Sequence, residues 1–232
     1  MKSSDRIFVA LDTTDTAQAV AVARDLIGLV GGAKVGKEFF TATGPEGVRQ
    51  VSDVGIPVFI DLKWHDIPNT VAGAVRASLA LRPAIVNVHA SGGPAMMRAA
   101  ADAAKEAGDQ RPIVLAVTVL TSMDDSDLLA TGVTSTAREQ VVRLARLAQD
   151  NDIDGVVCSA MEINALREAC GPNFKLLVPG IRPDWAASGD QKRVMTPREA
   201  VDRGADYLVI GRPITGAENP IDAAQRIAEE LA

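Results

Sequence analysis

Residues 59–71 have the sequence Phe-Ile-Asp-Leu-Lys-Trp-His-Asp-Ile-Pro-Asn-Thr-Val, in which an apolar strand runs directly into charged residues and then into a helix. Residues two apart on a strand share a face, so Asp61 and Lys63 are expected to point into the same space. Asp66 lies past the strand end, where the chain changes direction. A charge array at the carboxyl end of a parallel strand is where α/β folds place their chemistry.

The remainder of the chain repeats this pattern of an apolar strand followed by a helix. Continuous apolar runs suit parallel strands that are covered on both faces. Eight such units without a linker predict a single (β/α)8 TIM barrel over residues 1–232, with a doubly wound open sheet as the alternative. The expected strands are Ile7–Asp12, Ala33–Gly36, Val58–Leu62, Ile85–His89, Ile113–Thr118, Gly155–Ser159, Lys175–Val178 and Tyr207–Gly211.

Two helices have clear start signals. Thr136 and Glu139 have the spacing of a capping box, and Asn219 is a capping residue that precedes a proline at the first helical position. The helix of the second unit is expected within residues 38–54, a segment that is short and interrupted by glycine.

Composition narrows the class of protein. The 232 residues carry a formal net charge of −6 and only 3% aromatic residues, which argues against a surface for nucleic acid or for an anionic membrane. No apolar run approaches the ~20 residues of a membrane span, and the first one ends at Asp12, too early for a signal peptide. We expect a cytoplasmic protein in which Cys158 and Cys170 are reduced packing residues.

Charged residues recur at the ends of the first three strands. In a barrel these ends converge on one rim, where the sequence places Asp12, Lys34, Asp61 and Lys63. A lone pair of Asp61 with Lys63 would be a structural ion pair that closes the barrel end. Asp12, Lys34 and Asp66 add further alternating charges next to this pair. Burial of so many charges together is energetically costly, so a cluster of this kind is more typical of a functional site than of a structural ion pair.

The segments after the seventh and eighth strands have the residues of a phosphate site. Arg182 follows the seventh strand, and Gly211 with Arg212 follows the eighth, where this type of barrel commonly binds phosphate. Residues 181–192 are polar and predict a mobile loop that closes over the phosphate, with Gln191 as a donor. The alternatives are a surface arginine at the barrel end and an ordinary surface loop with a solvent-facing glutamine.

The chain resembles the bacterial-type orotidine 5′-phosphate decarboxylases over essentially its whole length. The Asp-x-Lys-x-x-Asp core alone marks a wider group of barrels, but the run that continues to Thr70 is much more specific. The resemblance implies decarboxylation of orotidine 5′-phosphate to UMP in de novo pyrimidine nucleotide synthesis, without a metal or cofactor. It rests on Asp12, Lys34-Val-Gly36, residues 61–70, Thr121-Ser122, residues 178–183 and Gly211-Arg212-Pro-Ile.

The resemblance also implies roles around the reacting carbon. Lys63 is the acid that delivers a proton to C6 of the pyrimidine, and Asp61 lies beside the departing carboxylate. Lys34 and Asp66 complete the charge network, with Asp66 supplied by the second subunit of a homodimer. Thr121 lies at the pyrimidine.

Further roles implied by the resemblance concern substrate binding. Asp12 and Lys34 hold ribose hydroxyls, and Thr70 reaches the ribose from the partner chain. On the phosphate side the implied contacts come from the loops after the last two strands. The remaining implied substrate contacts are Ile67, Pro179, Arg182, Gln191, Gly211 and Arg212.

Two other functions stay open. Magnesium-dependent sugar-phosphate decarboxylases or aldolases of the wider group share Asp-x-Lys-x-x-Asp, but they place an acidic metal ligand on the second strand, where Lys34 would repel Mg²⁺. The other candidate is a catalytically idle phosphoribosyl-binding barrel that acts as a sensor. The presence of Lys63 and Asp61 argues against a sensor, because nucleotide binding needs neither.

Overall fold

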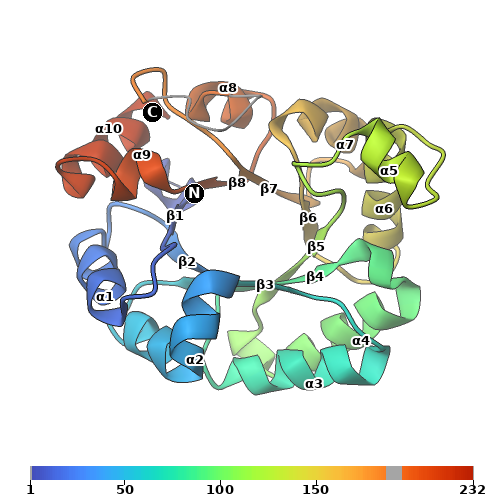
Figure 1. Cartoon of the computed structure of the whole chain (residues 1–232), viewed down its shortest axis with the longest axis horizontal. Coiled ribbons are helices and arrows are strands. Elements are labelled where there is room, and N and C mark those ends of the chain that lie inside the picture. Colours follow the sequence, from blue (N-terminus) through green and yellow to red (C-terminus); the bar gives the residue numbers. More distant parts are fainter. Residues whose placement is uncertain (1, 187–194, 232) are drawn as a thin grey trace.

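The computed structural model describes residues 2–186 and 195–231. Within these residues, eight parallel strands pair in chain order and the eighth pairs with the first, which closes a barrel (Figure 1). The TIM-barrel prediction is confirmed, and the open sheet is excluded. The strands are β1 (Ile7–Ala10), β2 (Gly32–Gly36), β3 (Val58–Trp64), β4 (Ile85–His89), β5 (Ile113–Val117), β6 (Gly155–Val157), β7 (Lys175–Pro179) and β8 (Tyr207–Ile210).

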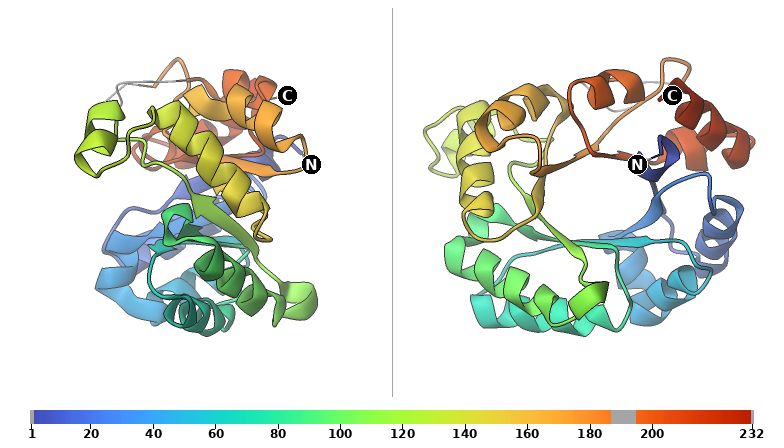
Figure 2. Two further views of the ribbon diagram at one scale, coloured as in Figure 1. Left: turned by 90° about the vertical axis from the view of Figure 1, so that its right-hand side faces the viewer. Right: turned by 180° about the vertical axis from the view of Figure 1, so that it is seen from behind.

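Helices surround the barrel on its outer face, as Figure 2 shows from the side and from behind. Among the described helices, none is both long and apolar enough to cross a membrane. The α-helices are α1 (Thr16–Asp25), α2 (Lys37–Ser52), α3 (Pro68–Leu79), α4 (Pro94–Lys105), α5 (Asp125–Ala130), α6 (Ala137–Gln149), α7 (Ile163–Cys170), α8 (Pro197–Asp202), α9 (Arg212–Thr215) and α10 (Pro220–Glu230).

The helix starts that the sequence predicts are confirmed. The hydroxyl of Thr136 accepts a hydrogen bond from the backbone N–H of Glu139, whose carboxylate accepts from the backbone N–H of Thr136, and this capping box begins α6. Asn219 caps α10 through its side-chain oxygen, which accepts hydrogen bonds from the backbone N–H groups of Ile221 and Asp222. α2, for which the sequence indicates a short segment interrupted by glycine, is kinked at Gly44 (φ 62), directly before Pro45.

Apolar side chains form two layers, one inside the barrel and one between the strands and the helices. Along β1 the residues alternate, with Ile7 and Val9 in the outer layer and Phe8 inside. The ring of Phe8 meets those of Phe59 and Tyr207 edge-on, with centroids 6.4 and 5.7 Å apart. A TIM barrel filled in this way binds its ligands at the carboxyl ends of the strands.

β3 is irregular where its charged residues begin. Its pairing with β4 shifts register between Ile60 and Trp64, and Lys63 has a left-handed backbone with φ 53. Simple alternation therefore does not describe how Asp61 and Lys63 are arranged. The strand extends two residues beyond its predicted end through a bulge, and bulges re-aim side chains next to functional sites.

Candidate active site

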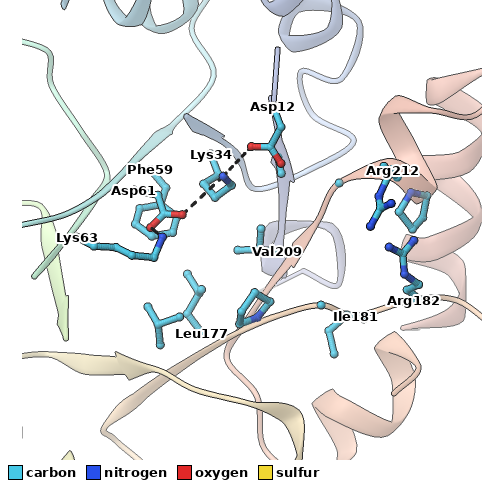
Figure 3. A pocket seen from close by; sticks show the side chains of 16 residues that line it. Asp12, Lys34, Phe59, Asp61, Lys63, Leu177, Ile181, Arg182, Val209 and Arg212 are labelled. Atoms are coloured by element: carbon cyan, nitrogen blue, oxygen red, sulfur yellow. Dashed lines mark hydrogen bonds and ion pairs between the residues drawn. The ribbon is translucent and has the colours of Figure 1, made fainter. Parts of the chain in front are cut away.

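A cavity of about 260 Å³ opens at the carboxyl ends of the strands. Its apolar floor belongs to the inner layer of the barrel and includes Phe59, Leu177 and Val209. Charged side chains form two groups, which Figure 3 shows on opposite sides of the cavity. The first group is Asp12, Lys34, Asp61 and Lys63, and the second is Arg182 and Arg212.

In the first group, carboxylates and ammonium groups alternate in a continuous series of ion pairs (Figure 3). Lys34 Nζ lies 3.0 Å from Asp12 Oδ1 and 3.6 Å from Asp61 Oδ2. Lys63 Nζ lies 2.6 Å from Asp61 Oδ1. The structure thus brings together four charged residues from three strand ends, although β1 ends at Ala10 and Asp12 lies in the segment that follows.

Burial makes this series tightly coupled. The side chains of Lys34 and Asp61 are only 10% and 12% exposed. Removal of one member of a buried pair leaves its partner charged and uncompensated, which is strongly destabilising. Asp61 therefore anchors two ammonium groups, one on each of its carboxylate oxygens.

Asn87 supports the end of this series, although no motif in the sequence singles it out. It is fully buried on β4. Its Oδ1 accepts a hydrogen bond of 2.8 Å from the backbone N–H of Lys63, and its Nδ2 donates one of 2.7 Å to Asp61 Oδ1. The available signal was a single amide side chain within the apolar run of β4, because a buried polar group requires partners.

The second charged group follows the last two strands. Arg182 comes after β7 and is buried, and its backbone N–H donates to the carbonyl of Met195 at 3.1 Å. Arg212 begins α9 directly after Gly211. Both guanidinium groups lie on the side of the cavity away from Lys63 (Figure 3), and such groups suit a phosphate dianion. Gln191, the other predicted residue of this group, lies outside the described residues.

The other predicted substrate contacts divide into two sets. Pro179 lines the cavity. Asp66, Ile67 and Thr70 are exposed at the start of α3, and Thr121 is exposed in the segment after β5. Asp66 Oδ1 accepts a hydrogen bond of 2.6 Å from the backbone N–H of Ile67. Within the described residues, one chain alone does not bring these last four residues to the cavity.

Two histidines lie beside this region without lining the cavity. The rings of His65 and His89 have centroids 5.5 Å apart. Burial, the neighbouring His65 and the ammonium groups of Lys37 and Lys63 together lower the pKa of His89 from 6.5 to about 4. His89 is therefore neutral at pH 7 and adds no charge next to the site.

Cysteine and metal chemistry have no evident place in the described part of the chain. Cys158 and Cys170 are free and buried, as the sequence predicts. Burial raises the pKa of both thiols, so neither is a thiolate at neutral pH. Across residues 2–186 and 195–231, the His, Cys, Asp and Glu side chains form no group of three that could hold a metal ion.

Residues 5–227 match the family model described as the orotidine 5′-phosphate decarboxylase / HUMPS family. The chain belongs to this family. It is 54% identical over 229 residues to the orotidine 5′-phosphate decarboxylase of Paramagnetospirillum magneticum, with 97% of each chain covered. The decarboxylase of Alcanivorax borkumensis is 53% identical over 232 residues, with 100% of each chain covered.

A solved structure supports the same family assignment. The crystal structure of orotidine 5′-phosphate decarboxylase from Lactobacillus acidophilus superposes with a TM-score of 0.83 at 35% sequence identity. The match covers 97% of this chain and 98% of that one. The barrel is therefore that of the orotidine 5′-phosphate decarboxylase / HUMPS family.

Proposed function

We propose that this chain decarboxylates orotidine 5′-phosphate to UMP, as a step of de novo pyrimidine nucleotide synthesis. The observation that carries the proposal is the ion pair of 2.6 Å between Lys63 and Asp61, at one side of a cavity that has two arginines at the other. A nucleotide with a carboxylate on its ring and a phosphate at its far end matches these two charged groups. Relatives at 54% and 53% identity are named for this reaction.

The reaction needs positive charge and a proton at the carbon that loses carbon dioxide. When the bond between C6 and the carboxyl carbon breaks, its electron pair stays on C6 in an orbital that the ring cannot delocalise well. Stabilisation is then electrostatic and depends on preorganised charge. The ammonium group of Lys63 supplies that charge and then donates its proton to C6, and the resulting neutral amine regains a proton from water.

Asp61 and Lys34 hold this ammonium group in place. Asp61 contacts Lys63 through Oδ1 and faces Lys34 through Oδ2. In the complex, Asp61 also lies beside the departing carboxylate. Asp12 and Lys34, at the other end of the series, bind the ribose hydroxyls, and Pro179 contacts the substrate from the cavity lining. In the complex, Thr121 from the segment after β5 lies at the pyrimidine.

The phosphate binds at the side of the cavity away from Lys63. Arg182 and Arg212 supply bidentate donors there, and Gly211 lets the backbone approach the phosphate. The resemblance implies a further donor from Gln191, which lies outside the described residues. Because the phosphate is remote from C6, its binding energy serves to orient the ring for reaction rather than to act on the breaking bond.

Asp66 and Thr70 act in the cavity of a second subunit in a homodimer, and Ile67, the remaining substrate contact of this segment, lies between them in the sequence. All three are exposed in one chain, and Ile67 has 67% of its surface exposed, which is unusual for a large apolar residue. Coverage of this face by a partner would bury Ile67. It would also bring Asp66 to the charge series of the other subunit, where it is the fourth member of the network formed with Lys34, Asp61 and Lys63.

The charge on β2 disfavours a magnesium-dependent reaction. The magnesium-dependent relatives carry an acidic metal ligand on this strand, whereas Lys34 is a buried cation that would repel Mg²⁺. A sensor without turnover is disfavoured by the Lys63–Asp61 pair, since phosphate and ribose recognition would not require it. The site is therefore suited to catalysis without a metal or cofactor.

A cytoplasmic location completes the proposal. Cys158 and Cys170 are free thiols, and thiols persist in the reduced state in that compartment. The net charge of −6 does not suit nucleic acid or an anionic membrane as a partner.

The test is to add orotidine 5′-phosphate to the purified protein in the presence of EDTA and to follow the ultraviolet absorbance. We expect the substrate band to disappear and UMP to form. A requirement for Mg²⁺ would favour the sugar-phosphate reactions, and tight binding without turnover would favour the sensor. Orotidine, which lacks the phosphate, should react far more slowly, because the arginines then contribute no binding energy.

A further inference from the structure

Asn87 lies inside the barrel beside the charge series, but it does not line the cavity. It is in the middle of β4 and has no exposed surface. Its two neighbours on β4 pair with Ile60 and Trp64, so the three residues 61–63 of β3 face Asn87 alone. The regular backbone pairing of β3 with β4 is interrupted here. The side chain of Asn87 makes hydrogen bonds to β3 where the backbone pairing is missing.

Both polar atoms of the Asn87 amide form hydrogen bonds where the pairing of β3 and β4 is interrupted. Its oxygen accepts the backbone N–H of Lys63 at 2.8 Å, and its nitrogen donates to Asp61 Oδ1 at 2.7 Å. A flipped amide would point N–H at N–H and a carbonyl oxygen at a carboxylate oxygen. Only one orientation of the side chain therefore satisfies both partners.

The two hydrogen bonds close a ring that contains the proposed acid. Asp61 Oδ1 accepts from Asn87 Nδ2 and also from Lys63 Nζ, the latter at 2.6 Å. The backbone N–H of Lys63 donates to Asn87 Oδ1, and this hydrogen bond completes the ring. Lys63 has φ 53, a backbone conformation that a non-glycine residue keeps only when the surrounding structure holds it. The hydrogen bond from the backbone N–H of Lys63 to Asn87 is one of the contacts that holds it.

We infer that Asn87 is a positioning residue for the decarboxylation. It sets the direction of the Asp61 carboxylate and the backbone of Lys63, and through both it sets where the ammonium group lies relative to C6. This inference rests on the proposed function. Asn87 does not line the cavity, so its effect passes through Asp61 and Lys63, and a shift of about 1 Å at a reacting group costs up to about 100-fold in rate.

Two variants separate the two hydrogen bonds. Asn87→Ala removes both. Asn87→Asp has nearly the same shape and keeps an acceptor for the backbone N–H of Lys63, but when ionised it sets a second carboxylate against Asp61 in place of the donor. Asn87→Asp also keeps the test available if Asn87→Ala fails to fold.

Asn151 offers a matched control. It is also buried, it accepts from Arg98 Nη2 at 3.1 Å, and it donates to the carbonyl of Leu147 at 2.7 Å. It lies between α6 and β6, at the amino end of the strands, away from the cavity. Asn151→Ala should lower the melting temperature and leave kcat unchanged.

The measurement is kcat per UMP-binding site, with sites counted by UMP titration well below the melting temperature. We expect both Asn87 variants to lose about 10- to 100-fold in kcat while KM and UMP affinity change little, because a hydrogen bond to a charged group is lost but the phosphate side is untouched. A purely structural role would instead reduce the number of binding sites and leave kcat per site unchanged.

Two results would overturn the inference. One is a wild-type kcat per site in Asn87→Ala. The other is a wild-type kcat per site in Asn87→Asp at a pH high enough to ionise the new carboxyl group, which then cannot donate to Asp61. Either result is informative only if the wild type decarboxylates orotidine 5′-phosphate, and absence of turnover in the wild type would instead count against the proposed function.

Discussion

Gly36 leaves open the space that the ammonium group of Lys34 occupies. A Cβ atom on Gly36 would lie 2.9 Å from Lys34 Nζ and 3.6 Å from Asp12 Oδ1. The first of these distances is shorter than real Cβ contacts. The obstructed atom is the end of a flexible side chain, so the fold can adjust, but Lys34 would then leave its place between Asp12 and Asp61.

We therefore expect Gly36→Ala to impair both catalysis and stability through Lys34. Gly36 has φ −98, which alanine adopts without strain, so the backbone itself contributes little to the loss. The free energy of unfolding should fall by about 1–3 kcal/mol because the buried ion pairs of Lys34 are weakened, and kcat/KM should fall by about 10- to 100-fold. Steady-state kinetics together with urea unfolding would check both numbers. A variant with wild-type kcat/KM would show that the position of Lys34 is not important for turnover.

The left-handed backbone of Lys63 predicts an unusual order of stability. Glycine adopts φ 53 freely, whereas alanine is disfavoured there by about 1 kcal/mol. Both Lys63→Gly and Lys63→Ala remove the ammonium group, so the loss of the ion pair with Asp61 is common to both. Urea unfolding should find Lys63→Gly the more stable variant by about 1 kcal/mol. The reverse order would argue against the left-handed conformation.

His89 predicts how stability depends on pH. In the folded protein the pKa of His89 is about 4, whereas its ordinary pKa, which applies to the unfolded chain, is 6.5. Between pH 4 and pH 6.5 the unfolded chain therefore binds more protons than the folded one. Stability from this group is therefore fully present above pH 6.5 and is lost as the pH falls towards 4. Urea unfolding at pH 7 and pH 5, at fixed protein concentration, should show a larger loss for the wild type than for His89→Gln. Equal losses would show that His89 titrates normally.

Mixed dimers test whether Asp66 acts across the subunit interface. Lys63→Ala and Asp66→Ala proteins should each be nearly inactive. After subunit exchange, half of the dimers are mixed, and one of the two sites in each mixed dimer has Lys63 and Asp66 intact if the residues come from different chains. The equimolar mixture should then recover about a quarter of the wild-type activity. No recovery, with subunit exchange confirmed by mass spectrometry, would assign Asp66 to the site of its own chain.

Much of the fold and of the candidate site could be predicted from the sequence, because apolar runs and charges are local signals. The strands of the barrel are continuous apolar segments, and Asp12, Lys34, Asp61 and Lys63 stand at or near their carboxyl ends. Parallel strands necessarily bring such ends together, so the meeting of these four side chains follows from the fold class.

Other features depend on tertiary pairing, which a single sequence does not reveal. The bulge in β3 and the positive φ of Lys63 arise from a register shift against β4. Asn87 acquires its importance only because that shift places it opposite residues 61–63. The exposure of Asp66 in one chain likewise has no local signature, and the resemblance to a family, rather than spacing, led to the expectation that it serves a second subunit.

Hydrogen exchange at C6 of UMP tests whether Lys63 is the group that delivers the proton to this carbon. The group that protonates C6 in the forward direction also removes that proton from bound UMP in the reverse direction. In D2O, the replacement of the C6 hydrogen of UMP by deuterium can be followed by proton NMR. We expect exchange with the wild type and none with a Lys63→Ala variant that still binds UMP. Exchange by that variant at the wild-type rate would show that another group delivers the proton.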